Sequence, residues 1–121
     1  MTDANDGERL DAATFERLVV EELDRLPDEM VDGLENVAFV TDDEAEDGEY
    51  LLGRYDGVDL TRRERYGFGE LPDRIVLYRL PLLAATADEA ELRAEVRTTL
   101  IHEIGHYFGL DDDRLHELGW A

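Results

Sequence analysis

The fold is organised around the segment DEAELRAEVRTTLIHEIGHYFG, residues 88–109. Apolar residues recur along it every four positions, a spacing that places them on one face of a helix. This stripe consists of Leu92, Val96, Leu100, Ile104 and Phe108. Asp88 is a favourable N-cap with Glu91 three residues on, the pattern of a capping box, and Gly109 is a natural stop. The sequence therefore predicts one long amphipathic helix here.

A His-Glu-x-x-His pentapeptide, residues 102–106, lies inside this helix. Positions four apart differ by only about 40° around a helix axis, so the imidazoles of His102 and His106 project to the same side and can reach one ion. Glu103 is offset by one residue, which places it to hold a metal-bound water rather than the metal. The alternative is that both are ordinary histidines on the surface of a helix.

A third ligand is needed, because catalytic zinc usually takes three protein ligands and leaves one position for water. Gly109 follows His106 by three residues and permits a sharp turn, and Asp112 follows Gly109 by three. Asp112 is therefore the expected third ligand. The alternatives are Asp111, Asp113 and His116, or a run of aspartates that only caps a last helix.

Further helical segments are expected near both ends of the chain. Asp11 is expected to cap a helix that runs to about Arg25, where Pro27 marks the stop. Its apolar face consists of Phe15, Leu18, Val19, Leu23 and Leu26. Residues 28–33 are expected to add one more turn. A short last helix is expected over residues 112–118, ended by Gly119.

Three segments have the character of strands: Leu34–Thr41, Tyr50–Tyr55 and Arg74–Leu80. Both faces of the third are apolar, which favours a well-covered strand, and Pro81 is expected to end it. Helices and strands together predict an α+β fold. A substrate in extended form is expected to add to an exposed sheet edge, for which Arg74–Leu80 is the candidate. Tyr66 and Tyr107 are candidate oxyanion donors, with packing as the alternative role.

The charge of the 121-residue chain is extreme, with 32 acidic residues, 12 basic ones and a net charge of −20. This balance argues against nucleic acid and anionic membranes as partners. Cysteine is absent, so any metal must be held by histidine and carboxylates. With no signal-peptide pattern, a cytoplasmic protein is expected. Adaptation to high salt and a coding bias both explain the acidity, and they are compatible.

The chain is expected to form one domain over residues 11–121, preceded by a flexible acidic tail, residues 1–10. The run 42–49 carries six acids in eight positions and is expected to be a solvated loop. The basic cluster Arg62, Arg63 and Arg65 is expected to pair with nearby carboxylates, with the binding of a substrate carbonyl or carboxylate as the alternative.

In these motifs the chain resembles the minimal-zincin, or minimal metalloprotease-like, family of small bacterial proteins. The resemblance rests on HEIGHYFGLDDDRLHELGW (102–120), LLGRYDGVDLTRRE (51–64) and LPDRIVLYR (71–79), and on the first helix ending in Leu26-Pro27. It covers nearly the whole chain, in order. It implies a truncated zincin fold: a small mixed sheet packed on an N-terminal helix and a long active-site helix, with a short C-terminal helix.

The resemblance also implies that His102, His106 and Asp112 are zinc ligands and that Glu103 is the general base. The expected function is thus a zinc-dependent metallohydrolase, most simply a metallopeptidase acting on a peptide or protein substrate through a zinc-activated water. We expect a monomer or a weak oligomer. The competing interpretations are a non-catalytic domain that binds a metal or a protein partner and a domain that holds no metal.

Overall fold

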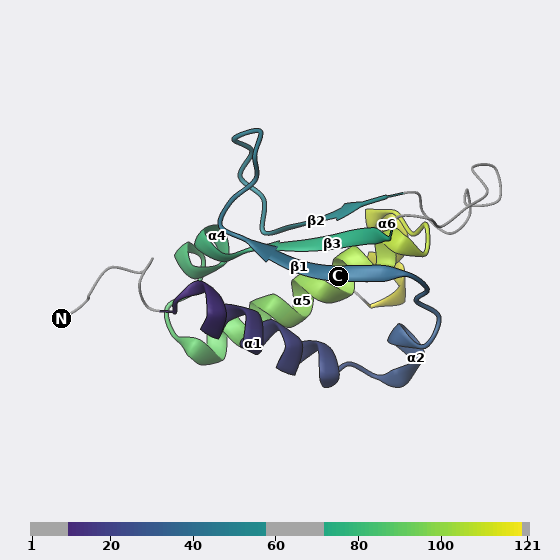
Figure 1. Ribbon diagram of the computed structural model, residues 1–121. Coiled ribbons are helices and arrows are strands. Elements are labelled where there is room, and N and C mark those ends of the chain that lie inside the picture. Colours follow the sequence, from purple (N-terminus) through teal and green to yellow (C-terminus); the bar gives the residue numbers. More distant parts are fainter. Residues whose placement is uncertain (1–9, 58–71, 120–121) are drawn as a thin grey trace.

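A three-stranded sheet is the framework of the protein (Figure 1). The computed structural model describes residues 10–57 and 72–119. The strand order is β1–β3–β2, in which β1 (Val37–Asp42) runs parallel to β3 (Asp73–Tyr78) and β2 (Gly53–Asp56) runs antiparallel to it. The tail predicted over residues 1–10 and the arginine cluster at 62–65 lie, except for Leu10, outside the described residues.

The helices α1 (Ala12–Asp24) and α5 (Glu89–Tyr107) pack side by side against one face of the sheet (Figure 1). The remaining helices are short: α2 (Asp28–Val31), α4 (Arg79–Ala84) and α6 (Asp112–Leu118). This is the α+β arrangement that the sequence predicts, a small mixed sheet on an N-terminal helix and a long helix, followed by a short C-terminal one.

Side-chain caps begin both long helices where the sequence places them. The Asp11 carboxylate accepts from the Thr14 N–H at 2.8 Å, and the Asp88 carboxylate accepts from the Glu91 N–H at 2.9 Å. Glu91 in turn accepts from the Ala87 N–H at 2.8 Å. These contacts satisfy N–H groups that have no partner within the helix. They fix the residue at which α5 begins and hence the positions of its later residues along the helix axis.

The main core lies between the sheet and the two long helices. The predicted stripe of α5 is buried there as far as Ile104, while Phe108 is partly buried at its edge. Ile75 and Leu77 of β3 face this core, whereas Val76 and Tyr78 pack with Ala45 on the opposite face. The apolar character of both faces of β3 is thereby explained, because protein covers the strand on both sides.

The position of β3 corrects one prediction. Arg74–Leu80 is predicted to offer an exposed edge, but β3 is the central strand and pairs with β1 on one side and β2 on the other. Its backbone groups are therefore used within the sheet. Among the described strands, β1 and β2 are the edges. The alternation of residues shows which faces of a strand are buried and carries no information on its lateral neighbours.

Pro81 corrects a second prediction, since it does not end the strand. The strand ends at Tyr78, and Pro81 is the third residue of α4, where it is buried. A proline is tolerated in the first turn of a helix because N–H groups there have no intrahelical acceptor. Strand and helix thus join without a loop between them.

The buried face of α1 holds a carboxylate that the predicted apolar face lacks. Glu22 is fully buried, while Leu23, predicted for that face, is only half-buried. Glu22 Oε2 accepts from Arg93 at 2.9 Å, and Oε1 accepts from Arg97 at 3.1 Å. Arg25 adds a contact of 3.3 Å. A charge buried in this way is tolerated because arginines from α5 neutralise it.

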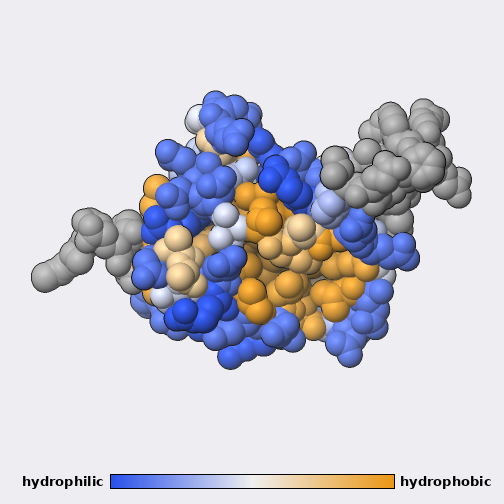
Figure 2. All heavy atoms as spheres, in the orientation of Figure 1, coloured by the Kyte–Doolittle hydropathy of each residue, from blue (hydrophilic) through white to orange (hydrophobic). Residues whose placement is uncertain are grey.

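The acidic run 42–49 forms the end of β1 and the connection to β2, as predicted for a loop. One residue anchors it: Ala45 is buried against Val76 and Tyr78. Apolar side chains are unevenly distributed over the surface. Figure 2 shows them gathered over β1 and beside it, framed by hydrophilic residues. Within the described part of the chain, every helix is too short or too polar to cross a membrane.

Candidate metal centre

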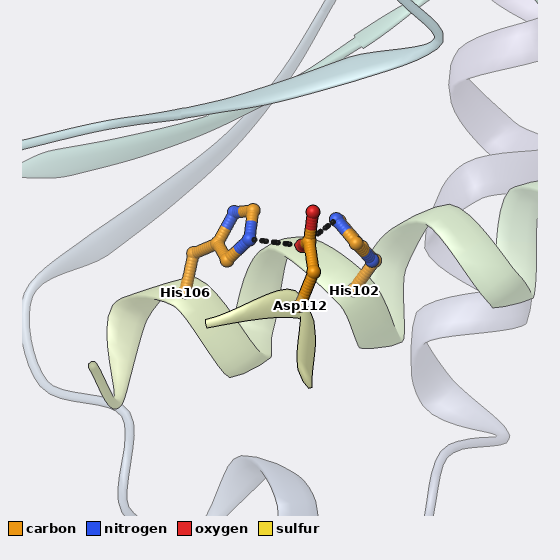
Figure 3. Close-up of side chains that lie close together, drawn as sticks. All are labelled: His102, His106 and Asp112. Carbon is orange, nitrogen blue, oxygen red and sulfur yellow. Dashed lines mark hydrogen bonds and ion pairs between the residues drawn. The ribbon is translucent and has the colours of Figure 1, made fainter. Parts of the chain in front are cut away.

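His102 and His106 lie one turn apart near the C-terminal end of α5, and their rings project to the same side of the helix (Figure 3). The ring centroids are 4.5 Å apart, with the planes inclined at 72°. Each side chain is 33% exposed, so both rings are held by the fold and still open to solvent. The helical spacing has the consequence that the sequence predicts.

The turn after α5 brings Asp112 back to these rings. Gly109 adopts φ 82°, in the left-handed region that favours glycine. Its N–H donates to the His106 carbonyl at 3.0 Å, and the Leu110 N–H donates to the Gly105 carbonyl at 3.0 Å. These two bonds form a Schellman motif, which closes the helix and reverses the chain.

The start of α6 determines which aspartate reaches the rings. The Asp111 carboxylate is engaged as the N-cap of α6, because it accepts from the Arg114 N–H at 2.9 Å. Asp112, the first residue of the helix, is then directed at the histidines. Asp113 and His116 are exposed on α6 and do not join the group formed by His102, His106 and Asp112.

The lack of a side chain at Gly105 lets α6 pack closely against α5. A Cβ atom at this position would lie 2.3 Å from Leu115 Cδ2 and 3.2 Å from its Cγ. Leu115 is fully buried, so it fills the space that the missing side chain leaves. The sequence indicates a small residue beside the histidines, but the role of Leu115 is missed, because only the packed helices show which side chain needs that space.

The side chains of His102, His106 and Asp112, which we call the metal group, converge on one point (Figure 3). Asp112 Oδ1 lies 3.3 Å from Nε2 of His102 and 3.3 Å from Nε2 of His106, and all three atoms lie within 4.8 Å of one another. Ligands bound at about 2.1 Å in a tetrahedron are separated by about 3.4 Å. The donor types therefore suit a zinc ion, and the two histidine–aspartate separations match its ligand spacing. Among the described residues the metal group is the one such set of three or more.

Glu103 lies beside this group without entering it. Its Oε1 is 3.2 Å from Nδ1 of His106, on the opposite side of the ring from Asp112, and the residue is only 6% exposed. A carboxylate on the second nitrogen orients an imidazole. Glu103 is therefore at the group, within reach of His106, and contributes no atom to the set that a metal would use.

Strand β2 crosses α5 directly at Glu103. A Cβ atom on Gly53 would lie 2.6 Å from Thr99 Cγ2 and 3.6 Å from Glu103 Cγ. Only a glycine lets the strand approach the helix this closely. Sequence reasoning missed Gly53. A glycine inside a strand pattern is the signal that could have found it, because it often marks close approach of another backbone.

The two candidate oxyanion donors have different outcomes. Tyr107 is fully buried, and its hydroxyl accepts from the Glu35 N–H at 3.2 Å. Its ring packs edge-on against Tyr55 at 6.1 Å. Tyr107 therefore anchors the segment before β1, the packing alternative. Tyr66 lies outside the described residues.

Comparison with known proteins identifies a family and a similar fold. The model of the zincin-like metallopeptidase family matches residues 29–120. Among solved structures, the chain is similar to a conserved hypothetical protein from Thermus thermophilus, with 26% sequence identity and a TM-score of 0.54. That match covers 88% of this chain and 95% of the other. None of the curated proteins compared matches it.

The family match spans β1 through α6 and thus the sheet, the long helix and all residues of the metal group. Membership of such a family implies a metal, usually zinc. The two histidines and the carboxylate found here are donors that suit that ion. The chain belongs to the zincin-like metallopeptidase family.

Proposed function

We propose that the protein is a zinc-dependent metallopeptidase in which His102, His106 and Asp112 hold the metal and Glu103 is the general base. The observation that carries this proposal is the convergence of the three donor atoms, with both histidine–aspartate separations at 3.3 Å. Two of the three side chains come from one helix and the third returns through a glycine turn. Zinc bound there supplies a Lewis acid that polarises a carbonyl and acidifies water.

Glu103 is suited to accept a proton because it is a buried carboxylate next to the metal group. In the proposed reaction it takes the proton of the attacking water and passes it to the amine that leaves. His106 Nδ1 holds its carboxylate in place, at 3.2 Å. The ring of His106 thus contacts both the proposed base, Glu103, and the proposed ligand Asp112.

The proposed substrate is an extended peptide that adds to the edge of β2 with which no other described strand pairs. This strand is an edge among the described strands, and it runs over α5 at Gly53, beside Thr99 and Glu103. A peptide that pairs with such an edge is held by main-chain hydrogen bonds. β2 therefore replaces Arg74–Leu80 as the candidate edge.

The test compares the protein with Glu103→Gln. We expect one equivalent of zinc to bind to both, and hydrolysis of a diverse peptide library to fall by about 10²–10⁴-fold in the variant, the usual contribution of a general base. Glu95→Gln is the matched control, since Glu95 lies two turns earlier on α5. An unchanged rate in Glu103→Gln would contradict the proposal.

A second candidate function is a non-catalytic zinc-binding domain. The observation that favours it is that the donor group joins the end of α5 to the start of α6, a helix of only seven residues. A metal at this joint stabilises the fold whether or not any bond is cleaved. Zinc-dependent melting without hydrolysis of the same library supports this candidate against the first.

A further inference from the structure

A cavity lies on the face of the sheet opposite the two long helices, away from His102, His106 and Asp112. It has a volume of about 250 Å³ and is formed by all three strands and by the acidic connection between β1 and β2. Val40 and Val76 give it an apolar floor, and Tyr78, Asp42, Glu46 and Arg54 are among its walls. Since β3 directs Val76 and Tyr78 away from the helices, the cavity shares no residue with the proposed zinc site.

Tyr78 carries a polar group that needs a partner inside this cavity. The residue is only 5% exposed, and its hydroxyl makes no hydrogen bond to another residue of the chain as far as the structure describes it. A buried hydroxyl without a partner is costly, and buried polar groups are nearly always bonded. Burial also raises the pKa of the Tyr78 phenol, so it remains a neutral group that both donates and accepts.

The arginines that face the cavity are already neutralised. Arg54 bonds to Asp47 at 3.1 Å and to Glu49 at 2.7 Å. Arg74 bonds to Asp56 at 2.9 Å. These pairs leave the two guanidinium groups with little attraction for an anion.

Two acids at the cavity have no such partner. Among the described residues, Asp42 accepts only from the backbone N–H of Asp43, at 2.9 Å, and Glu46 makes no ion pair with any of them. The uncompensated charge is therefore negative, and it lies beside a buried hydroxyl that can accept a hydrogen bond. Both observations favour a cation that carries N–H donors.

A bare metal ion does not suit these groups. Of the residues that the structure describes, only His102, His106 and Asp112 bring three donor atoms within 4.8 Å of one another. The carboxylates of Asp42 and Glu46 do not converge in that way with a third ligand. An ammonium group can instead donate its N–H groups to the two carboxylates and to the Tyr78 hydroxyl, and its carbon chain can lie on Val40 and Val76.

We propose that this cavity binds a primary alkylammonium ion, with the ammonium group bonded to the carboxylates of Asp42 and Glu46 and to the Tyr78 hydroxyl, and with the alkyl chain on the apolar floor. The site is independent of the proposed peptidase function. It adds to the protein a binding site for organic amines, either a free diamine or the side chain of a lysine.

The test is a titration of the full chain with 1,4-diaminobutane at high salt, followed by calorimetry and by the NMR signals of Tyr78. High salt is used because it screens diffuse attraction to a chain of net charge −20. We expect saturable binding of one equivalent. Glu46→Gln should weaken it about tenfold, since it removes a charge-assisted hydrogen bond. Tyr78→Phe should weaken it about fivefold and leave the melting temperature unchanged or raised, because in the free protein its hydroxyl has no partner among the described residues and its burial is costly.

Glu44→Gln is the matched control, because Glu44 is an exposed acid of the same loop that does not line the cavity. It makes the same change in net charge and should leave the affinity unchanged. His102→Ala should also leave it unchanged, which separates this site from amine bound to zinc. Nα-acetyl-lysine methylamide carries the same ammonium on a peptide backbone. If it binds more tightly than the diamine, a lysine side chain is the natural ligand.

Three results would overturn the proposal. The first is the absence of saturable binding by either amine up to about 10 mM, a concentration at which a specific site of this size is occupied. The second is an equal loss of affinity in Glu44→Gln and Glu46→Gln, which would reduce the effect to the overall charge. The third is an unchanged affinity in Tyr78→Phe, which would remove the hydroxyl from the site.

Discussion

The two halves of α5 use charged side chains in opposite ways. In the first half, Arg93 and Arg97 bond to the buried Glu22 of α1, so that opposite charges meet and are satisfied. In the second half, His102 and His106 face Asp112, whose side chain is 77% exposed. The first arrangement is complete within the protein, whereas the second gathers donors around a point that a cation can occupy.

On this one helix, paired charges and unpaired donors therefore have different roles. A buried charge that is fully paired holds the structure together and has no capacity left for a ligand. A cluster of donors that is open to solvent and lacks an opposite charge is suited to bind one. The following predictions test this contrast, in order of the expected effect.

The largest effect is expected on zinc binding. Replacing either histidine, as in His106→Ala, should lower zinc affinity by about 100-fold or more, because a set of three ligands loses one. Isothermal titration at high salt measures it. His116→Ala is the control, since His116 is exposed on α6 outside the group. Equal affinities for the two variants would place the metal elsewhere, among the surface carboxylates.

Glu22→Gln should destabilise the first half of the helix without affecting the second. It keeps the shape of the side chain but removes the charge that Arg93 and Arg97 neutralise. Breaking a fully buried pair costs about 3–5 kcal/mol, and we expect about 2 kcal/mol here because both arginines are partly exposed and can turn to water. Urea denaturation measures the loss. We also expect the folded Glu22→Gln variant to bind zinc with unchanged affinity.

The pH dependence of that loss has a definite sign. Burial opposes the ionisation of Glu22, but the hydrogen bonds from Arg93 and Arg97 outweigh it, and the pKa of Glu22 lies below its ordinary value of 4.5. A lowered pKa adds stability above the ordinary value, and this stability is lost as the pH falls through the folded-state pKa. The difference between the protein and Glu22→Gln should therefore be constant above about pH 5 and shrink in more acidic solution.

Gly105→Ala should reverse the usual effect of that substitution. Alanine in place of glycine normally stabilises a helix by about 1 kcal/mol. Here the new methyl would overlap the Leu115 side chain, which is fully buried, so Leu115 would have to shift against its packed neighbours. We expect a net loss of about 1–2 kcal/mol from overpacking, together with weaker zinc binding, since α6 carries Asp112. Thermal melting with and without zinc measures both.

The double variant Gly105→Ala with Leu115→Ala is the control for this explanation. The smaller side chain on α6 makes room for the methyl, so the two substitutions together should cost less than the sum of each alone. Additive losses would contradict the contact between Gly105 and Leu115 as the cause.

The smallest effect is expected at a pair of exposed charges. Arg114 and Glu117 of α6 lie 2.9 Å apart, with both side chains more than half exposed. Arg114→Ala should change the free energy of unfolding by no more than about 0.5 kcal/mol, because solvent screens such pairs. Urea denaturation beside Glu22→Gln gives the comparison. A loss as large as that of Glu22→Gln would show that burial does not govern these ion pairs.

Local features of the fold were open to prediction from the sequence. The caps at Asp11 and Asp88, the extent of α5 and the turn at Gly109 all agree with the structure, because they depend on residues within a few positions of each other. The exchange of Leu23 for Glu22 on the buried face of α1 was not open to prediction in this way. Its neutralising arginines lie more than seventy residues along the chain.

By itself the sequence determined that two imidazoles lie on one side of a helix, since helical geometry alone relates His102 to His106. It limited the third donor to a few residues after Gly109. Which of these residues lies at the rings depends on the tertiary structure: Leu115 packs into the space at Gly105, Asp111 caps α6, and Asp112 is thereby turned to the rings. Lateral order in the sheet was decided there too, because strands pair with partners that local sequence patterns do not specify.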